Sequence, residues 1–324
     1  MTLLQNLAHA LGLDADQAAP PRKEIDAVQT IVYRGEGHRD FCQDFLVQHD
    51  SPNFFVGVIL DGSSGGIHSQ FASALFGKIF NLLLRSRGML DKRNPSSEPI
   101  DIAADLMYEF CRQLVRIKDI LSMAHNELLC TILLEVYSKE KDKLFVIAFG
   151  AGYVRVNGAG YKIENTKYGD TVVDGELKLG VNKPDYLIDD IDRIIPLYED
   201  GAEHLADDPE EWERFIAQLQ DQRARFDQWF LEHKPTFEFH GLKDFSIATD
   251  GIFTFHRGRE FVTDQVIELL LDRPEGYGGI KNERNLRSKM NIIAARPRNA
   301  EDTNPDKLWA VNDDDVSLIR VVVK

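Results

Sequence analysis

The 324-residue sequence has few cysteines and no long apolar segment. Its three cysteines, Cys42, Cys111 and Cys130, are too few and too far apart for a disulfide framework or for a typical cysteine-ligated metal site. No apolar run approaches the length of a membrane-spanning helix. Residues 1–13 carry no positive region and no clear cleavage site, so we expect no signal peptide. These absences predict a cytoplasmic protein that does not contact a membrane.

Positive charge is also in deficit. The chain has 38 Lys and Arg against 53 Asp and Glu, which gives a formal net charge of −15. Such a balance argues against nucleic acid as the main partner, because the phosphate backbone would be repelled. It is compatible with binding of cations. Internal repeats and low-complexity tracts are absent from the sequence as well.

The most informative segment is an apolar run that ends in an acid. Residues 54–60 are all apolar or glycine, and Asp61-Gly62 follows directly. A short run rich in β-branched and aromatic residues predicts a buried strand, so Asp61 is expected at the edge of a sheet. Gly62 would let the main chain approach a ligand closely. Taken alone, the same letters are also typical of a tight Asp-Gly turn.

Three further apolar segments carry an aspartate at one end. These aspartates are Asp44, before residues 45–47; Asp250, after residues 245–249; and the run Asp313-Asp314-Asp315, immediately before residues 316–323. Carboxylates that converge at strand ends are the ligands that hard cations such as Mg²⁺ and Mn²⁺ prefer. The combination therefore indicates a metal site at one edge of a sheet.

The remaining pattern predicts an α+β fold. Helical spacing over residues 65–88 and 100–124 predicts two long helices, the first of which would bury Ile67, Phe71, Leu75, Ile79 and Leu82 or Leu83. Strands are expected over residues 128–137 and 144–149, joined by a charged hairpin turn. Helices and hairpins that are segregated along the chain predict a four-layer αββα sandwich of two mainly antiparallel sheets flanked by helices.

A further helix is predicted over residues 209–233, because Asp208 and Pro209 form a strong helix start. This helix carries an aromatic stripe that includes Trp212, Phe226 and Trp229. Such a stripe is typical of a helix packed in a core, and it is also compatible with a surface that docks a protein partner.

Several short segments, in order along the chain, resemble the motifs of the protein phosphatase 2C family of metal-dependent serine/threonine phosphatases. The segments are Arg39 with Gln43-Asp44; Asp61-Gly62 with Gly65-Gly66; Leu129-Cys130-Thr131; Ala248-Thr249-Asp250-Gly251; and Asp314-Asp315-Val316-Ser317. The resemblance implies a phosphatase domain over residues 26–324. Before it, apolar spacing over residues 2–13 predicts a short amphipathic helix, and Pro20-Pro21 indicates a linker, so that residues 1–25 form an N-terminal helix and linker. The resemblance also implies a helical insertion at about residues 199–240.

The resemblance implies roles for individual residues. Asp61 would bridge two Mn²⁺ or Mg²⁺ ions, and Arg39 would hold the substrate phosphate as a bidentate fork. A hydroxide shared by the two ions would attack phosphoserine or phosphothreonine in a protein substrate. The further metal ligands would be the Gly62 carbonyl, Asp250, Asp314 and, through a water, Asp44.

Some positions depart from the family pattern. Ala151 and Thr254 stand where carboxylates of a third metal site are found, so we expect two ions and no third site built by the protein. Ser63 replaces a histidine, which leaves His38 and His68 as open alternatives for the proton donor. Two other readings follow. One is an inert phosphatase-like module that binds phosphorylated partners, and the other is an adaptor that acts through the 209–233 helix.

Overall fold

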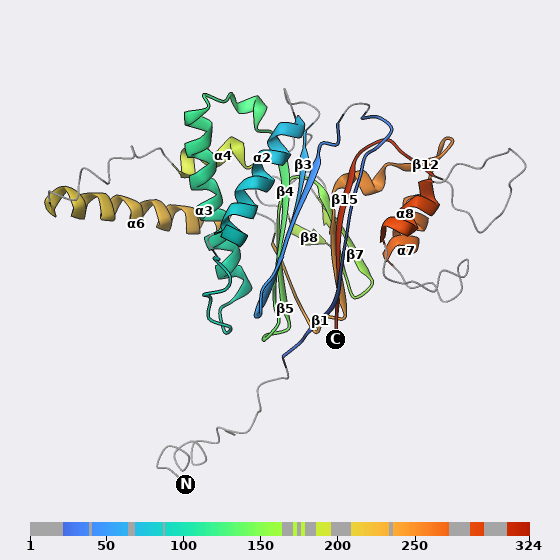
Figure 1. Cartoon of the computed structure of the whole chain (residues 1–324), viewed down its shortest axis with the longest axis horizontal. Coiled ribbons are helices and arrows are strands. Elements are labelled where there is room, and N and C mark those ends of the chain that lie inside the picture. Colours follow the sequence, from blue (N-terminus) through green and yellow to red (C-terminus); the bar gives the residue numbers. More distant parts are fainter. Residues whose placement is uncertain are drawn as a thin grey trace, which may run out of the picture.

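The computed structural model has four layers, with a pair of packed sheets at the centre and helices on both outer faces (Figure 1). It describes residues 22–38, 41–63, 69–86, 88–163, 171–173, 176–178, 186–195, 209–232, 236–271, 286–294 and 310–324. The predicted N-terminal helix lies outside these residues. The α+β sandwich that the sequence predicts is therefore confirmed.

Both large sheets have five strands, and all their neighbouring strands run antiparallel. The first sheet has the order β1 (Ile25–Tyr33), β15 (Val316–Val323), β11 (Asp244–Ala248), β6 (Gly152–Val156) and β7 (Ala159–Ile163). The second has the order β10 (Thr236–His240), β5 (Lys143–Phe149), β4 (Cys130–Ser138), β3 (Phe54–Gly62) and β2 (Asp44–Asp50). Residues 236–240, at the end of the predicted helical insertion, thus form an edge strand.

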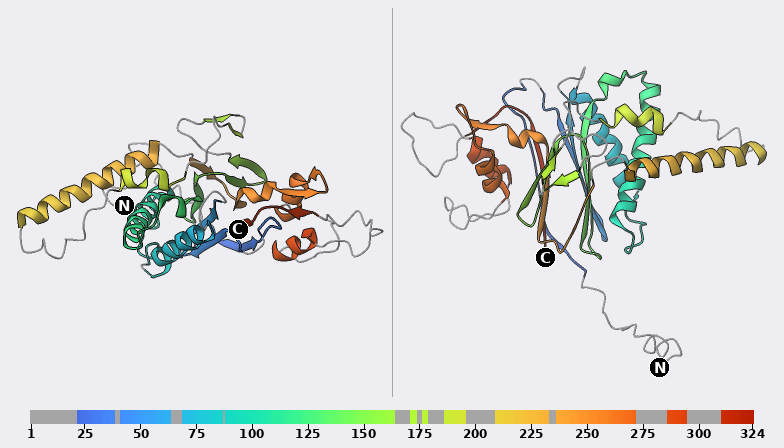
Figure 2. Two further views of the ribbon diagram at one scale, coloured as in Figure 1. Left: turned by 90° about the horizontal axis from the view of Figure 1, so that it is seen from above. Right: turned by 180° about the vertical axis from the view of Figure 1, so that it is seen from behind.

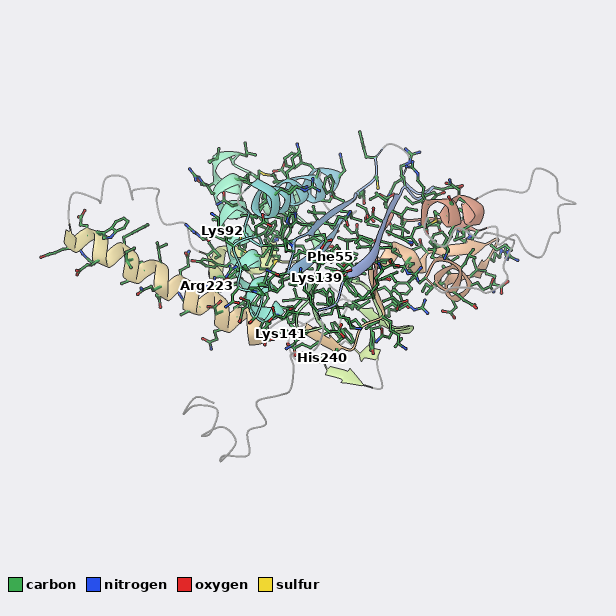
Figure 3. All side chains as sticks on the ribbon, turned by 60° about the horizontal axis from the view of Figure 1, so that its bottom comes forward. Phe55, Lys92, Lys139, Lys141, Arg223 and His240 are labelled. Atoms are coloured by element: carbon green, nitrogen blue, oxygen red, sulfur yellow. The ribbon has the colours of Figure 1, made fainter. Side chains whose placement is uncertain are left out.

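The strands read as continuous apolar runs because both faces of each sheet are covered. Along β3, Phe55 and Ile59 point between the sheets, whereas Phe54 and Val56 point toward the helices. Phe55 lies near the centre of the molecule (Figure 3). In β15, Ile319 belongs to the core between the sheets. The two-residue alternation of strands therefore sorts these side chains into separate cores.

Helices cover the outer face of each sheet (Figures 1 and 2). On the second sheet lie α2 (Ser69–Asn81), its π-helical continuation η1 (Leu82–Ser86), α3 (Pro99–Ile120), α4 (Ile188–Ile194) and α6 (Pro209–Glu232). On the first sheet lie α7 (Thr263–Leu271) and α8 (Leu286–Ala294). No helix among the described residues is both long enough and apolar enough to cross a membrane.

Short elements complete the fold. They are η2 (His125–Glu127), η3 (Asp250–Phe253), the β8 (Thr171–Val173) and β9 (Glu176–Lys178) pair, and a small sheet of β13 (Glu260–Phe261), β12 (Phe255–Arg257) and β14 (Val311–Asn312).

The buried face of α2 differs from the predicted one. Phe71 is 43% exposed, while Ala72 and Phe76 are completely buried. The reason is the small residue Gly77, where an added Cβ would overlap the ring of Phe45 on β2. Glycine and alanine let the helix approach the sheet closely, so they set its orientation in place of the larger apolar residues on which the prediction relied. Of the other predicted core residues, Ile79 and Leu83 are buried, Leu75 packs partly buried against the core, and Ile67 lies outside the described residues.

Candidate functional site

Antiparallel pairing brings the predicted acids to one edge of the sandwich. Because neighbouring strands run in opposite directions, the starts of β2 and β15 lie beside the ends of β3 and β11. Asp44 and Asp61 are directly opposite each other in the β2–β3 register, so both side chains lie on the same face of the second sheet. Asp250 follows β11 and Asp314 precedes β15. Each of these four aspartates thus stands at a strand end on this edge.

Asp44 connects the two sheets. Its Oδ2 accepts a hydrogen bond of 2.8 Å from the Thr249 hydroxyl, and that hydroxyl accepts one of 2.9 Å from the Ser317 main-chain N–H. The other oxygen, Oδ1, is buried and has no hydrogen-bond partner. Burial, reinforced by the charges of Asp315 and Asp314, raises the pKa of Asp44 to about 8. Asp44 is therefore a carboxyl group with one oxygen still available as a ligand.

Asp61 lies in a cluster of like charges. Burial raises its pKa well above the usual range, and the charges of Asp44, Asp250 and Asp314 raise it further. Asp250 is close enough to Asp61 for the two carboxyl groups to shift each other's pKa. The pKa values of Asp250 and Asp314 are also raised, mainly by burial. These carboxyl groups repel one another when ionised, and a bound cation would remove that repulsion.

Asp315 is a site residue that the motif did not single out. Its Oδ1 accepts a 2.8 Å hydrogen bond from the Gly35 N–H, and its Oδ2 accepts one from the Gln43 N–H. The side chain is completely buried, and His38 Nδ1 lies 2.9 Å from Oδ2. Because both oxygens are engaged by the chain itself, Asp315 holds the segment before β2 in place. Asp314 is the more exposed of the two, with His38 Nε2 3.6 Å from its Oδ1.

Two glycines make room for the main chain that carries Asp314 and Asp315. A Cβ at Gly35 would overlap the carbonyl group of Asp314, and one at Gly251 would overlap the carbonyl oxygen of Asp315. Thr254 ties the same segments together: its hydroxyl donates to the Gly251 carbonyl at 2.9 Å and accepts from the Asp314 N–H at 3.2 Å. In this structure Thr254 is part of the framework that positions the acids.

Gly62 and Ser63 are fixed by hydrogen bonds from three directions. The Gly62 N–H donates to the Gln43 carbonyl, and the Ser63 N–H donates to the Leu129 carbonyl, both at 3.1 Å. The hydroxyl of Tyr186, just before α4, donates to Ser63 Oγ at 2.6 Å. Tyr186 is buried, and it comes from a segment in which the sequence showed no regular pattern. It is a second residue that the sequence analysis missed.

Two of the cysteines lie close to the acids. Burial raises the pKa of the Cys42 thiol to about 12, and the nearby carboxylates of Asp315 and Asp44 add to the shift. The pKa of Cys130 is also well above its usual value, chiefly because of burial. Since the thiolate is the reactive form of cysteine, these protonated thiols are poor nucleophiles. Neither cysteine is therefore suited to act as a catalytic nucleophile.

Part of the predicted site lies outside the described residues. Arg39, His68 and the Gly65-Gly66 pair belong to this part. The phosphate-holding role of Arg39 thus stays a prediction, as do the metal-binding roles of Asp44, Asp61, Gly62, Asp250 and Asp314. Of the two histidines considered as proton donors, His38 is the one that the structure places beside the acids.

Within the described part of the chain, no three His, Cys, Asp or Glu side chains are arranged as a metal-coordination group. The chemistry of the acids nevertheless fits a hard divalent cation. The donors are carboxylate oxygens, one of which is buried without a partner, and burial together with like-charge repulsion raises the pKa of Asp61. Oxygen donors of this kind suit Mg²⁺ and Mn²⁺ better than softer metals.

Comparisons with known proteins give matches only among solved structures. No protein-family model and no curated protein matches the sequence. A bacterial serine phosphatase matches with a TM-score of 0.50 and 12% identity, covering 93% of this chain and 98% of that one. Serine/threonine phosphatase Stp1 from Staphylococcus aureus matches with a TM-score of 0.50 and 11% identity, covering 93% and 96%.

A third similar structure is the catalytic domain of the serine/threonine protein phosphatase PstP in complex with two manganese ions. Its TM-score is 0.45 at 12% identity, with 91% of this chain and 97% of that chain covered. At these identities the comparisons establish the fold alone. The chain has the sandwich fold of the protein phosphatase 2C family over nearly its full length.

Proposed function

We propose that the protein is a metal-dependent phosphoprotein phosphatase that hydrolyses phosphoserine and phosphothreonine. The observation that carries the proposal is the position of Asp61. It lies at a strand end, opposite Asp44, and its pKa is raised by burial and by the charges of Asp44, Asp250 and Asp314. A cluster of acids that repel one another is costly for a protein unless it binds a cation.

The same residues define which groups would hold the metal. In this proposal Asp61, Asp250, Asp314 and the Gly62 carbonyl are ligands, and Asp44 acts through a water. Two bound Mn²⁺ or Mg²⁺ ions would supply an activated hydroxide and neutralise charge on the phosphoryl oxygens. The hydrogen bonds of Gly62 and Ser63 would keep the Gly62 carbonyl oriented.

Two cationic or ionisable side chains complete the proposed site. Arg39 would bind two phosphate oxygens as a bidentate fork, which a lysine cannot do equally well. His38, whose Nδ1 lies 2.9 Å from Asp315 Oδ2, would donate a proton to the leaving oxygen. The substrate in this proposal is a phosphorylated protein.

A direct assay tests this function. Purified full-length protein is expected to hydrolyse an aryl phosphate and phosphoserine or phosphothreonine peptides when Mn²⁺ is added. Turnover should disappear with a chelator and return when Mn²⁺ is restored in excess, because the metal supplies the nucleophile. Calorimetric titration with Mn²⁺ in the absence of substrate reports binding independently of turnover.

One alternative function is favoured by specific residues. Ser63, Ala151 and Thr254 depart from the family pattern, and Thr254 is engaged in hydrogen bonds with the main chain. An inert module of this fold would bind phosphorylated partners without hydrolysing them. Binding of Mn²⁺ without turnover on either class of substrate would establish this alternative and contradict the enzyme proposal.

The Tyr186→Phe variant tests whether the Ser63 contact supports metal binding. Loss of the 2.6 Å hydrogen bond is expected to weaken Mn²⁺ binding about tenfold, the lower end of the range of about 10- to 100-fold for residues that orient metal ligands. Calorimetric titration measures the affinity. Tyr108→Phe is the matched control, because it removes a tyrosine hydrogen bond to Gln222 on α6, away from the acids. Equal Mn²⁺ affinity in both variants would show that Tyr186 has no role in positioning the site.

A further inference from the structure

Asn312 uses both ends of its side-chain amide beside the acids. The residue is buried in the short strand β14, where it pairs with Phe255 on β12. Its Nδ2 donates a hydrogen bond to the Asp314 carbonyl, and its Oδ1 accepts one from the Thr254 hydroxyl. An amide offers a donor and an acceptor side by side, whereas a carboxylate only accepts. Asn312 thereby joins two segments that are 58 residues apart in the sequence.

Thr254 closes these hydrogen bonds into a ring around the main chain of Asp314. Its hydroxyl oxygen accepts a hydrogen bond of 3.2 Å from the Asp314 N–H. The hydroxyl proton is shared between Asn312 Oδ1 and the Gly251 carbonyl, which is 2.9 Å away. The N–H and the carbonyl of Asp314 are therefore both held by side chains that also bond each other. The bond to Gly251 connects this ring to the residue that follows Asp250.

The ring holds together two acids that repel each other. Burial raises the pKa of Asp250, and the charge of Asp314 raises it further. When both carboxyl groups are ionised, their repulsion acts to separate η3 from the segment before β15. The carboxylate of Asp314 is also oriented locally, because its Oδ1 accepts a 2.8 Å hydrogen bond from the Asp315 N–H. Movement of this segment would therefore carry the carboxylate with it.

We propose that Asn312 is a positioning residue, and that Thr254, Asn312 and Asp314 form a clasp that fixes the separation of the Asp250 and Asp314 carboxylates before a metal ion binds. The inference rests on the metal-binding role proposed for these two acids. Without the clasp, repulsion would move the Asp314 segment away from η3, and metal binding would have to restore the geometry. A site that is already in its binding geometry binds more tightly than one that its ligand must order.

Calorimetric titration of the metal-free, full-length chain with Mn²⁺ tests the proposal. Thr254→Val keeps the shape of the side chain but removes the hydroxyl, and it should weaken Mn²⁺ binding about 10- to 100-fold. Asn312→Leu, which removes both hydrogen bonds of the amide, should weaken binding to a similar extent. Thr254→Ser keeps the hydroxyl and should bind Mn²⁺ with nearly wild-type affinity. Unchanged affinity in Thr254→Val and Asn312→Leu, or equal losses in Thr254→Val and Thr254→Ser, would overturn the proposal.

Ser51→Ala is the matched control for a general loss of stability. Ser51 is buried in the turn between β2 and β3, at the opposite end of these strands from the acids. Its hydroxyl donates to the Phe54 carbonyl at 2.9 Å and accepts from the Phe54 N–H at 3.0 Å. Both Ser51→Ala and Thr254→Val should need less urea to unfold, but only Thr254→Val should lose Mn²⁺ affinity. An equal loss of Mn²⁺ affinity in the control would overturn the proposal.

A second comparison tests whether the clasp acts through Asp314. In the Asp314→Asn background, adding Thr254→Val should have little further effect on the remaining Mn²⁺ affinity, because the carboxylate that the clasp positions is already absent. A second full loss of affinity would overturn the proposal. None of these titrations needs turnover. Mn²⁺ binding without hydrolysis would therefore contradict the proposed function while the affinities still decide the role of Asn312, and a wild-type chain that binds no Mn²⁺ would overturn both.

Discussion

Replacement of Asp61 with asparagine is expected to lower Mn²⁺-dependent turnover of an aryl phosphate about 10³-fold or more. The amide keeps the size of the side chain but removes the negative charge at the position proposed to bridge the two ions. Calorimetric titration should show that Mn²⁺ binding at the paired site is lost as well. Steady-state kinetics over a range of Mn²⁺ concentrations separates a weaker metal site from a slower chemical step.

Stability distinguishes this effect from misfolding. In the absence of metal, the pKa of Asp61 is raised, so its ionisation opposes folding near neutral pH. The Asp61→Asn variant should therefore need more urea to unfold than the metal-free wild type. Asp119→Asn, at the exposed end of α3, is the matched control and should change neither turnover nor stability. Near-normal turnover in Asp61→Asn would contradict the proposed reaction.

The second large effect concerns Glu135, in the middle of β4. Its side chain is completely buried between the sheets, both carboxyl oxygens lack a hydrogen-bond partner, and burial raises its pKa well above 4.5. Gly57 lies opposite on β3, where an added Cβ would overlap Glu135 Oε1. The missing side chain at Gly57 is therefore what gives the carboxyl group its space.

The sign of the resulting pH dependence follows from the raised pKa. Below pH 4.5 the group is protonated in both the folded and the unfolded chain, and it costs no ionisation energy. Above that pH the unfolded chain releases the proton and the folded chain retains it, so Glu135 lowers stability by about 1.4 kcal/mol per pH unit until its folded pKa is reached. Glu135→Gln should thus gain stability over the wild type as the pH rises.

Urea unfolding of the wild type and of Glu135→Gln, at several pH values between about pH 5 and about pH 8, measures the difference in their free energy of unfolding. The carboxyl groups of the candidate site make the same pH-dependent contribution to the stability of both proteins, so that contribution cancels in the comparison. Glu260→Gln, at an exposed position in β13, should track the wild type at every pH. If the difference in unfolding free energy between wild type and Glu135→Gln stayed constant with pH, the prediction would be wrong. Glu135 would then ionise to the same extent in the folded and the unfolded chain.

Much of the fold could be predicted because strand and helix periods are local. The apolar run before Asp61 and the acids at strand ends were sufficient to place one edge of a sandwich. The predicted buried face of α2 was displaced, because the fit of Gly77 against Phe45 on β2 turns Phe76 toward the core and leaves Phe71 exposed. Which face of α2 is buried is decided only by how the helix packs on the sheet.

The sequence analysis missed two site residues, Asp315 and Tyr186, and only one of them could have been predicted from a sequence pattern. Asp315 carried a signal, since the alternation that points Ile319 inward also points Ser317 and Asp315 inward. The sequence analysis instead followed the first aspartate of the motif. Tyr186 carried no such signal, because its contact with Ser63 joins segments 123 residues apart. Hydrogen bonds at that separation do not leave a periodic pattern.

The place of β15 in the first sheet has a consequence for biosynthesis. β15 lies between β1 and β11, and it follows every other strand in chain order. On the ribosome, β1 emerges before every other strand of its sheet and must wait for its neighbour until residues 316–323 have left the exit tunnel. Until then β1 and one edge of β11 are unpaired, and unpaired edges favour association between nascent chains. Asp314 enters with that same strand, so a nascent chain cannot assemble the acidic cluster before the sheet closes.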